Sequence, residues 1–283
     1  MLTLIITGLL LGLIYALISV GLTLQFGVMN LVNFGYGTFA IIASYLCYTL
    51  FRAGVNPFIT IIPLFIFLGI LGIFLEKFIF YRVKNANYQV MVTMAMSMIV
   101  VGILLQLYTA TPINILIPLT YQYFNVGDFL QIWAVQLYGA IASVAMLSGL
   151  HLFLQKTQTG RAIRAVADDE PTALLMGIDS KRIHNLTAFL SFGFAAVAGV
   201  FLVMMYSLIP ESGGDYNLIA FIICVFGGLG SIKGALLGGL VIGELQILIS
   251  YYVGPWTKFV SLFIVFIITL LIRPTGLFGL KRA

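Results

Sequence analysis

The chain has 283 residues, of which 61% are hydrophobic and only 8% are charged, and its formal net charge is +5. Soluble globular domains have about 25% charged residues, so this composition, with a mean hydropathy of +1.13, excludes an ordinary soluble protein. Because the apolar stretches are too long for the strands of a membrane β-barrel, the sequence predicts an all-α polytopic membrane protein. We expect one transmembrane domain over residues 1–283 and no nucleic-acid partner.

The first predicted spanning helix covers residues 2–24, where Gly8 and Gly12 have the spacing that lets another helix approach closely. The segment 25–37 that follows is too polar and too rich in glycine for a helix that faces lipid. Irregular backbone at membrane depth occurs only inside protein or beside a wet cavity. We interpret this segment as a broken or re-entrant stretch that lines a pathway; the alternative is a simple turn between two helices. Its candidate pathway residues are Gln25, Asn30, Asn33, Gly35 and Gly37.

The middle of the chain continues with apolar stretches of spanning length. Helices are predicted over residues 38–51, 57–75, 88–109, 132–154 and 184–206. The last of these is rich in small residues, which indicates close helix packing. Between the predicted helices 88–109 and 132–154, residues 111–131 form a polar loop that has no Lys or Arg.

The most highly charged part of the chain is the loop 155–182, which carries five basic and four acidic residues. Good helix formers over 160–167 and a proline after the acids 168–170 predict two short helices joined by an acidic turn, with Gly177 ending the second. Residues 173–176 are apolar although the loop is predicted to lie in water. An ordinary solvated loop is the alternative, but an exposed apolar face favours a binding partner.

The C-terminal third contains a second glycine-rich break. Residues 218–226 are apolar but too short to span a membrane alone, and Gly227, Gly228 and Gly230 then interrupt the helix before Ser231. We expect these four residues to lie near the pathway. Two more helices are predicted over 235–253 and 258–272, which brings the total to about eight or nine crossings.

The positions of the basic residues predict the orientation of the protein. They concentrate in the segment 77–84, in the loop 155–182 and in the C-terminal tail, which contains Arg273, Lys281 and Arg282. Cytoplasmic loops carry an excess of Lys and Arg. The three segments, including the C-terminus, are therefore predicted to be cytoplasmic, and residues 111–131 and 210–216 to face outward.

Few residues within the membrane offer reactive chemistry. Glu244 is an acid inside a predicted span and is either a proton relay or a structural group that bonds a neighbouring helix or subunit; the lack of a nearby charged partner favours the structural role. We interpret His151 and His184 as interfacial residues, and expect Cys47 and Cys224 to be free and buried. No cluster has the pattern of a catalytic or metal site, and no Walker-type loop is present. We therefore expect no enzymatic activity, metal or cofactor in this chain.

Three stretches resemble one protein family. GRAIRAVADDEPTALLMGIDSKRIHNLTAFLSFGFAAVAGVF resembles the cytoplasmic loop and following helix of the branched-chain amino acid (Liv-type) ABC transporter permeases, in particular the first of their two permease subunits. The stretches GLIYALISVGLTLQFGVMNLVNFGYGTFAIIASY and VFGGLGSIKGALLGGLVIGELQ resemble the N-terminal and glycine-rich C-terminal segments of the same family. ABC importers more widely share a Glu-Ala-Ala…Gly pattern in this loop. This chain departs from that pattern in two ways: Pro171 replaces an alanine, and Glu170 and Gly177 are one residue further apart.

This resemblance implies a permease subunit of an ABC importer in the cell inner membrane. Its implied partners are a second, homologous permease chain, two ATPase subunits that bind the ATP, and an extracytoplasmic solute-binding protein. The implied solute is a branched-chain or other neutral amino acid. By position, the residues at or near the helix that couples to the ATPase are Arg161, Arg164, Asp168, Glu170, Ala173 and Gly177.

Two other classes of function stay open at the level of the sequence. The same importer machinery serves urea, short amides or sugars in related branches. An independent secondary transporter is the other class, although such a protein usually needs more intramembrane charges than Glu244 alone.

Overall fold

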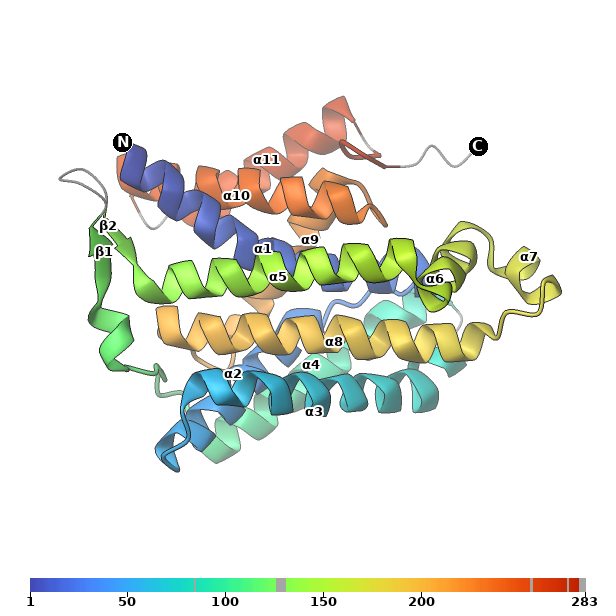
Figure 1. The fold of residues 1–283 in the computed structure, drawn as a ribbon, viewed down its shortest axis with the longest axis horizontal. Coiled ribbons are helices and arrows are strands. Elements are labelled where there is room, and N and C mark those ends of the chain that lie inside the picture. The colour runs from blue at the N-terminus through green and yellow to red at the C-terminus, as the bar shows by residue number, and fades with distance from the viewer. Residues whose placement is uncertain (84, 126–130, 255–256, 274, 280–283) are drawn as a thin grey trace.

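Helix α8 (Ser180–Met205) runs through the middle of the structure, and 83% of its most apolar stretch is buried. The computed structural model describes residues 1–83, 85–125, 131–254, 257–273 and 275–279. Four helices surround α8 (Figure 1): α1 (Leu2–Met29), α2 (Tyr36–Arg52), α3 (Pro57–Phe78) and α5 (Ala134–Lys156). The other helices are η1 (Phe80–Arg82), α4 (Ala86–Tyr108), η2 (Pro118–Tyr121), α6 (Gln158–Asp168), α7 (Glu170–Leu175), α9 (Ser212–Gly227), α10 (Ile232–Tyr252) and α11 (Lys258–Ile272).

The small residues of α8 explain its central position. Ala195, Ala196 and Ala198 are fully buried, and the backbone of Gly199 lies so close to α2 that the hydroxyl of Ser44 donates a 2.7 Å hydrogen bond to its carbonyl oxygen. Small side chains allow such close contact between helix backbones. The expectation of tight packing around this helix is therefore confirmed.

The glycines of α1 bring it into direct contact with α10. A Cβ atom on Gly12 would lie 2.6 Å from the carbonyl oxygen of Gly239, and one on Gly8 would lie 2.7 Å from the Cα of Glu244. Real Cβ atoms do not approach other atoms so closely. The Gly8–Gly12 spacing thus does what its pattern predicts: it allows two backbones to touch.

A larger side chain at this contact should separate the helices. We expect Gly12→Leu to lower the stability of the protein by about 1–3 kcal/mol, because overpacking forces backbone shifts. The measurement is the thermal unfolding midpoint of the purified protein in detergent. Gly102→Leu on α4 is the matched control, since a Cβ atom there meets nothing within 4 Å. Equal midpoints for the two variants would contradict the contact.

Long apolar helices place the protein in a membrane. Among the described residues, six helices are long and apolar enough to cross one. The share of the spanning stretch that is buried falls to 11% for α4, whose exposed side chains include Met98, Ile99 and Leu107. An exposed apolar surface of this size is suited to lipid. The prediction of an all-α polytopic membrane protein is confirmed.

Three predicted segments differ in the structure. Residues 25–29 continue α1, so that irregular backbone is limited to the short stretch before α2 begins at Tyr36. Helix α9 begins at Ser212, inside the predicted outer loop. The predicted loop 111–131 contains η2 and the strand β1 (Tyr123–Asn125), which pairs antiparallel with β2 (Gln131–Trp133) at the start of the helix predicted over 132–154. The predicted tail residues Lys281 and Arg282, like Lys84, lie outside the described residues.

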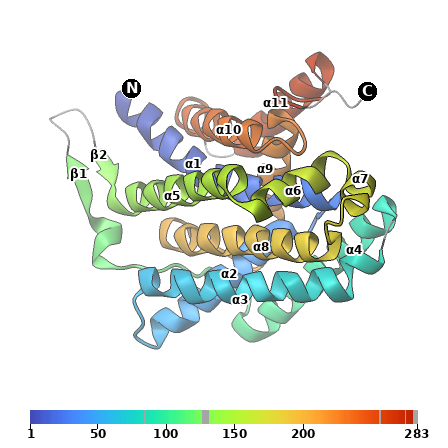
Figure 2. The ribbon, with the colours of Figure 1, turned by 45° about the vertical axis from the view of Figure 1, so that its right-hand side comes forward.

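The two ends of the bundle differ in what they carry. Helices α6 and α7 project from one end, which we call the loop end (Figures 1 and 2). The hairpin of β1 and β2 and the start of α1 lie at the opposite end, the hairpin end. The last turn of α3 also belongs to the loop end, because Glu76 contacts His184 in the first turns of α8. The arrangement therefore gathers the basic segments around residues 77–82 and 155–182 at one end.

Candidate functional site

The loop 155–182 folds as two short helices, as the sequence predicts. The hydroxyl of Thr157 caps α6 by accepting a 2.9 Å hydrogen bond from the backbone N–H of Gly160. Asp169 is the N-cap of α7. Gly177, which has a φ of +82°, follows its end and donates to the carbonyl of Leu174. These local caps define the ends of α6 and of the six-residue helix α7.

The two helices have buried and exposed faces. Ile163 and Val166 of α6 and Ala173 of α7 are buried. The apolar tip of α7, which we define as Leu174, Leu175 and Met176, is exposed; Leu175 and Met176 keep 88% and 79% of their accessible surface. The predicted coupling residues that are exposed on α6 are Arg161, Arg164 and Asp168. This end of the molecule thus presents apolar side chains beside charges, a combination typical of protein interfaces.

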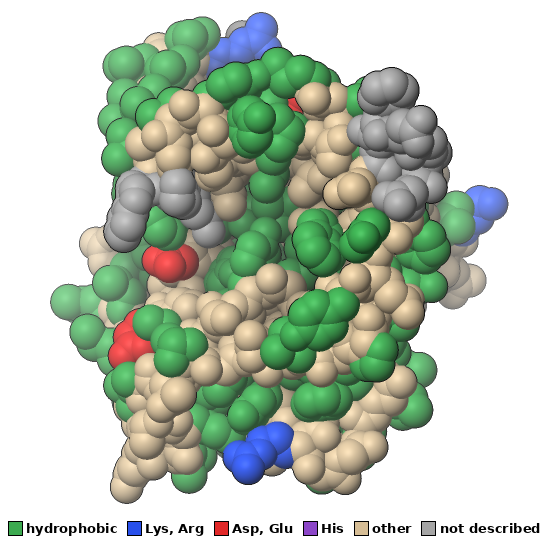
Figure 3. All heavy atoms as spheres, turned by 90° about the vertical axis from the view of Figure 1, so that its left-hand side faces the viewer, with side chains coloured by type: hydrophobic (Ala, Val, Ile, Leu, Met, Phe, Trp, Pro, Cys, Tyr) green, Lys and Arg blue, Asp and Glu red, His purple; other side chains and the backbone are tan. Residues whose placement is uncertain are grey.

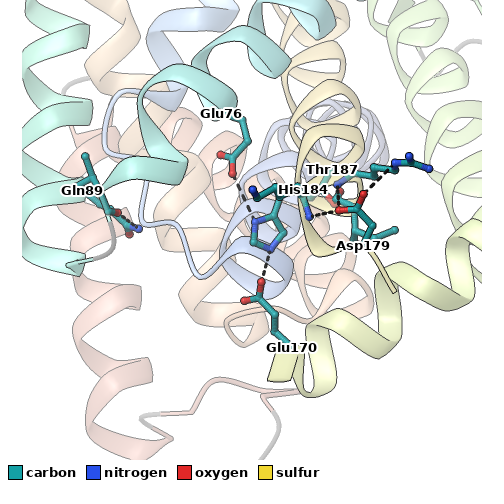
Figure 4. A network of polar contacts seen from close by, with 10 residues as sticks. Glu76, Gln89, Glu170, Asp179, His184 and Thr187 are labelled. Carbon is teal, nitrogen blue, oxygen red and sulfur yellow. Dashed lines mark hydrogen bonds and ion pairs between the residues drawn. The ribbon is translucent and has the colours of Figure 1, made fainter. Parts of the chain in front are cut away.

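A histidine connects α7 to the bundle. The Nδ1 atom of His184 lies 3.6 Å from a carboxylate oxygen of Glu76 on α3, and its Nε2 atom lies 3.6 Å from a carboxylate oxygen of Glu170 on α7. Figure 4 shows the imidazole between the two acids. The side chains of His184 and Glu76 are 9% and 4% exposed, whereas that of Glu170 is 36% exposed. His184, which the sequence places near a membrane edge, is buried between these two acids.

The polar side chains around the break between α1 and α2 bond to one another. The amide of Gln25 donates a 2.8 Å hydrogen bond to Ser191 on α8 and accepts one of 3.0 Å from Asn33. The oxygen of Asn33 in turn accepts a 3.0 Å bond from the backbone N–H of Gly35. All of these side chains are buried. The network fastens the irregular stretch to the central helix, because a buried amide is costly unless it is paired.

The other predicted residues of this break have distinct positions. Asn30 is exposed and ends α1 in the left-handed conformation, with a φ of 50°. The N–H of Gly37 donates to the side chain of Asn217 on α9, and a Cβ atom on Gly35 would meet α4. Asn30 therefore does not join the network of Gln25 and Asn33, although all three residues come from one segment.

The second glycine-rich break adjoins the first. Gly228 and Gly230 have φ angles of +105° and +84°, which glycine adopts readily. Ser231 caps α10 by accepting a 3.1 Å hydrogen bond from the N–H of Gly234. A Cβ atom on Gly27 in α1 would lie 3.0 Å from the Cα of Gly230. The structure thus brings together the two breaks that the sequence singles out.

A contact of the C-terminal segment was not expected. The N–H groups of Leu277 and Phe278 donate hydrogen bonds of 2.9 Å and 3.0 Å to the carbonyls of Phe226 and Gly227. These carbonyls end α9 and have no partner within the helix. The segment therefore covers the second break, and no motif in the sequence signals this pairing.

Glu244 and the cysteines lie apart from these groups. Glu244 is partly exposed on α10. It takes part in no ion pair with another described residue. Cys47 and Cys224 are free and buried, as expected. In the described part of the chain, no group of three or more His, Cys, Asp and Glu side chains has the geometry to hold a metal ion.

A cavity of about 320 Å³ lies at the hairpin end. Figure 3 shows this face, which hydrophobic side chains dominate and which is hollowed near its centre. Burial raises the pKa of Tyr206 to about 12, so that its phenol stays protonated, and the buried Oε1 atom of Gln136 accepts no hydrogen bond from the described residues. The cavity is thus mostly apolar with a few polar groups. Its lining includes Trp133, Val135, Gln136, Met204, Met205 and Tyr206.

Comparisons with known proteins match nearly the whole chain to one family. Residues 4–270 match the family described as branched-chain amino acid transport system / permease component. The high-affinity branched-chain amino acid transport system permease protein LivH of Escherichia coli is 31% identical, with 96% of this chain and 93% of that protein covered. BraD of Pseudomonas aeruginosa, a permease protein of the same description, is 30% identical, with 97% and 94% covered.

One solved structure has a similar fold. PsaBC from Streptococcus pneumoniae, solved in complex with Fab, matches with a TM-score of 0.51 and covers 96% of this chain and 91% of the matched chain. The sequence identity is only 15%, so this match concerns the fold alone.

Proposed function

The chain belongs to the family of branched-chain amino acid transport system permease components, and from this we propose that it is the first permease subunit of an ABC importer. The proposed cargo is a branched-chain or other neutral amino acid, carried inward across the cell inner membrane. A second, homologous permease chain, two ATPase subunits and an extracytoplasmic binding protein complete the proposed machine. ATP is bound and hydrolysed by the partner subunits.

The observation that carries the proposal is the exposed apolar tip of α7. Helix α7 projects from the loop end (Figure 1), and Leu174, Leu175 and Met176 are exposed there, although apolar side chains are normally buried away from water. Arg161, Arg164 and Asp168 of the adjoining α6 are exposed as well. In the proposed complex this surface docks an ATPase subunit, and the caps of α6 and α7 hold it in place for that contact.

The distribution of charge supports the orientation. Lys77 and Arg82 lie at the same end as the loop 155–182, since α3 and α8 meet there through Glu76 and His184. Cytoplasmic segments are enriched in basic residues. We therefore place the loop end and the C-terminus in the cytoplasm and the hairpin end outside.

We propose that the two helix breaks beside the pathway are where the backbone changes conformation during transport. Gln25 and Asn33 hold one break, and Gly227 to Ser231 form the other. ATP binding would bring the two ATPase subunits together and rock the permease between two arrangements, each biased by a partner's binding energy. Short irregular stretches absorb such changes in backbone angle more readily than continuous helix.

The cavity at the hairpin end is the proposed outer mouth of the pathway. Its volume of about 320 Å³ lies within the range of small-molecule sites, and its largely apolar lining suits an aliphatic side chain. We expect Met205→Trp to fill the cavity and suppress solute uptake, while the ATPase subunits still co-purify. Met98→Trp is the matched control because Met98 is 75% exposed on the outside of α4. Normal uptake by the Met205 variant would exclude the cavity from the pathway.

The solute itself is tested by competition. Proteoliposomes that contain the complete complex take up labelled leucine when ATP and the binding protein are supplied. We expect excess valine or isoleucine to suppress this uptake, and urea or ribose to leave it unchanged. If leucine is not transported but urea, a short amide or a sugar is, the importer assignment stands and the amino acid assignment falls.

A further inference from the structure

His184 occupies a position that links three elements. It lies in the first turns of α8 and contacts Glu76 near the end of α3 and Glu170 at the start of α7, each at 3.6 Å. Figure 4 shows the ring directed between the two carboxylates. Helix α7 has few other attachments to the transmembrane bundle: Ala173 is buried, but the apolar tip is in solvent.

The position of His184 between two acids would suit an imidazole with two N–H donors. A neutral imidazole has one N–H donor and one acceptor, whereas the protonated ring has two donors. Both ring nitrogens of His184 face a carboxylate oxygen, so the protonated form is the one that attracts both acids. A neutral ring would direct a lone pair at one of them.

The neighbouring cations are engaged elsewhere. The ammonium group of Lys181 lies 5.1 Å from the ring centre of Tyr81 on η1, and that of Lys77 lies 5.7 Å from the ring centre of Phe78. Arg182 pairs with Asp179 at 3.0 Å. Among the described residues, His184 is therefore the basic side chain that lies within 4 Å of Glu76 and Glu170.

The two sides of the cluster differ in strength. Glu76 is 4% exposed, so its contact with His184 is shielded from water, whereas Glu170 is 36% exposed. Ion pairs in contact with solvent are weak and form and break readily. At 3.6 Å both contacts are longer than a hydrogen bond, so the Glu170 contact, which water can reach, can tighten or open as α7 moves.

We propose that His184 is the positioning residue that ties α7 to the transmembrane helices α3 and α8, so that a displacement of α7 is transmitted to the pathway. This inference rests on the proposed docking of an ATPase subunit at α7. The contact between His184 and Glu170 holds the joint closed, and Glu76 keeps the imidazole in place. His184 does not contact the solute or ATP in this scheme; it acts through Glu170.

The test measures coupling in the complete complex reconstituted in proteoliposomes. The readouts are co-purification of the ATPase subunits, ATP hydrolysis, and the number of solute molecules taken up per ATP hydrolysed. The variants are Glu170→Gln, His184→Gln and the double variant. His151→Gln is the matched control, because it makes the same chemical change at an exposed histidine on α5.

We expect both single variants to retain the ATPase subunits and to hydrolyse ATP, but to take up several-fold fewer solute molecules per ATP. The double variant should take up as many solute molecules per ATP as His184→Gln alone, because both changes break the same contact between His184 and Glu170. The His151 variant should match the wild type. A solute-to-ATP ratio that is unchanged in Glu170→Gln would overturn the proposal; this variant alters a side chain that is 36% exposed.

The outcomes separate this inference from the proposed function. If the ATPase subunits fail to co-purify with the wild-type chain, the docking proposal fails and the role of His184 fails with it. If they co-purify and single-variant effects are additive in the double variant, docking stands and the joint through His184 is rejected. If His184→Gln does not fold, Glu170→Gln alone decides.

Discussion

Replacing Leu175 with glutamate should release the ATPase subunits from the permease. Leu175 is 88% exposed at the apolar tip of α7, so the change leaves the fold of the permease intact. In the proposed complex the side chain lies in the centre of the docking surface. A buried anchor of this kind is worth about 2 kcal/mol or more, which is roughly 30-fold in affinity.

The measurement is the dissociation constant of the purified ATPase subunit for the permease held in lipid nanodiscs. Leu175→Met is the matched control, because it keeps an apolar side chain of similar size, and it should bind nearly as well as the wild type. Charge reversal at Arg164, which is exposed on α6, should weaken docking as well. If Leu175→Glu binds the ATPase subunit as tightly as Leu175→Met, α7 is not the docking element.

Replacing Gln25 with leucine should disable transport while docking remains. Gln25 accepts from Asn33 and donates to Ser191, and leucine can do neither. The amide of Asn33 is then buried without its acceptor, at a cost of about 1–3 kcal/mol. We expect the stretch between α1 and α2 to detach from α8, the thermal midpoint to fall and uptake to be lost.

The matched control for this change is Gln106→Leu, at an exposed glutamine of α4. It should leave both the midpoint and the uptake unchanged. Co-purification of the ATPase subunits should be the same in both variants, since neither position belongs to α6 or α7. Normal uptake by the Gln25 variant would show that the break does not need its attachment to α8.

Much of the structure at the loop end could be predicted because the residues that start and end its helices lie close together in the sequence. Asp169 and Pro171 define the start of α7, and Gly177 its end, within a few residues of each other. Glycine spacing likewise predicted that another helix approaches α1 closely, and the structure shows that this helix is α10. Such features depend on the backbone preferences of residues that are close in the sequence, so they can be predicted from the sequence alone.

What the sequence does not reveal are pairings between distant residues. Nothing near His184 indicates that Glu76 on α3 lies beside it, and an isolated histidine at the edge of a span is typical of an interface. The hydrogen bonds of Leu277 and Phe278 with the end of α9 also involve only backbone atoms, which carry no side-chain signal. The hairpin of β1 and β2 has strands of only three residues each, too short for a clear alternating pattern.

The energy source of transport tests the account most directly. The tagged chain is purified from its native membrane, alone and with whatever subunits accompany it, and labelled leucine uptake is measured in proteoliposomes with ATP or with a proton or sodium gradient. We predict that ATPase subunits co-purify and that uptake requires both them and ATP. Uptake by the chain alone, driven by an ion gradient, would contradict the account and would make Glu244 on α10 the first residue to study.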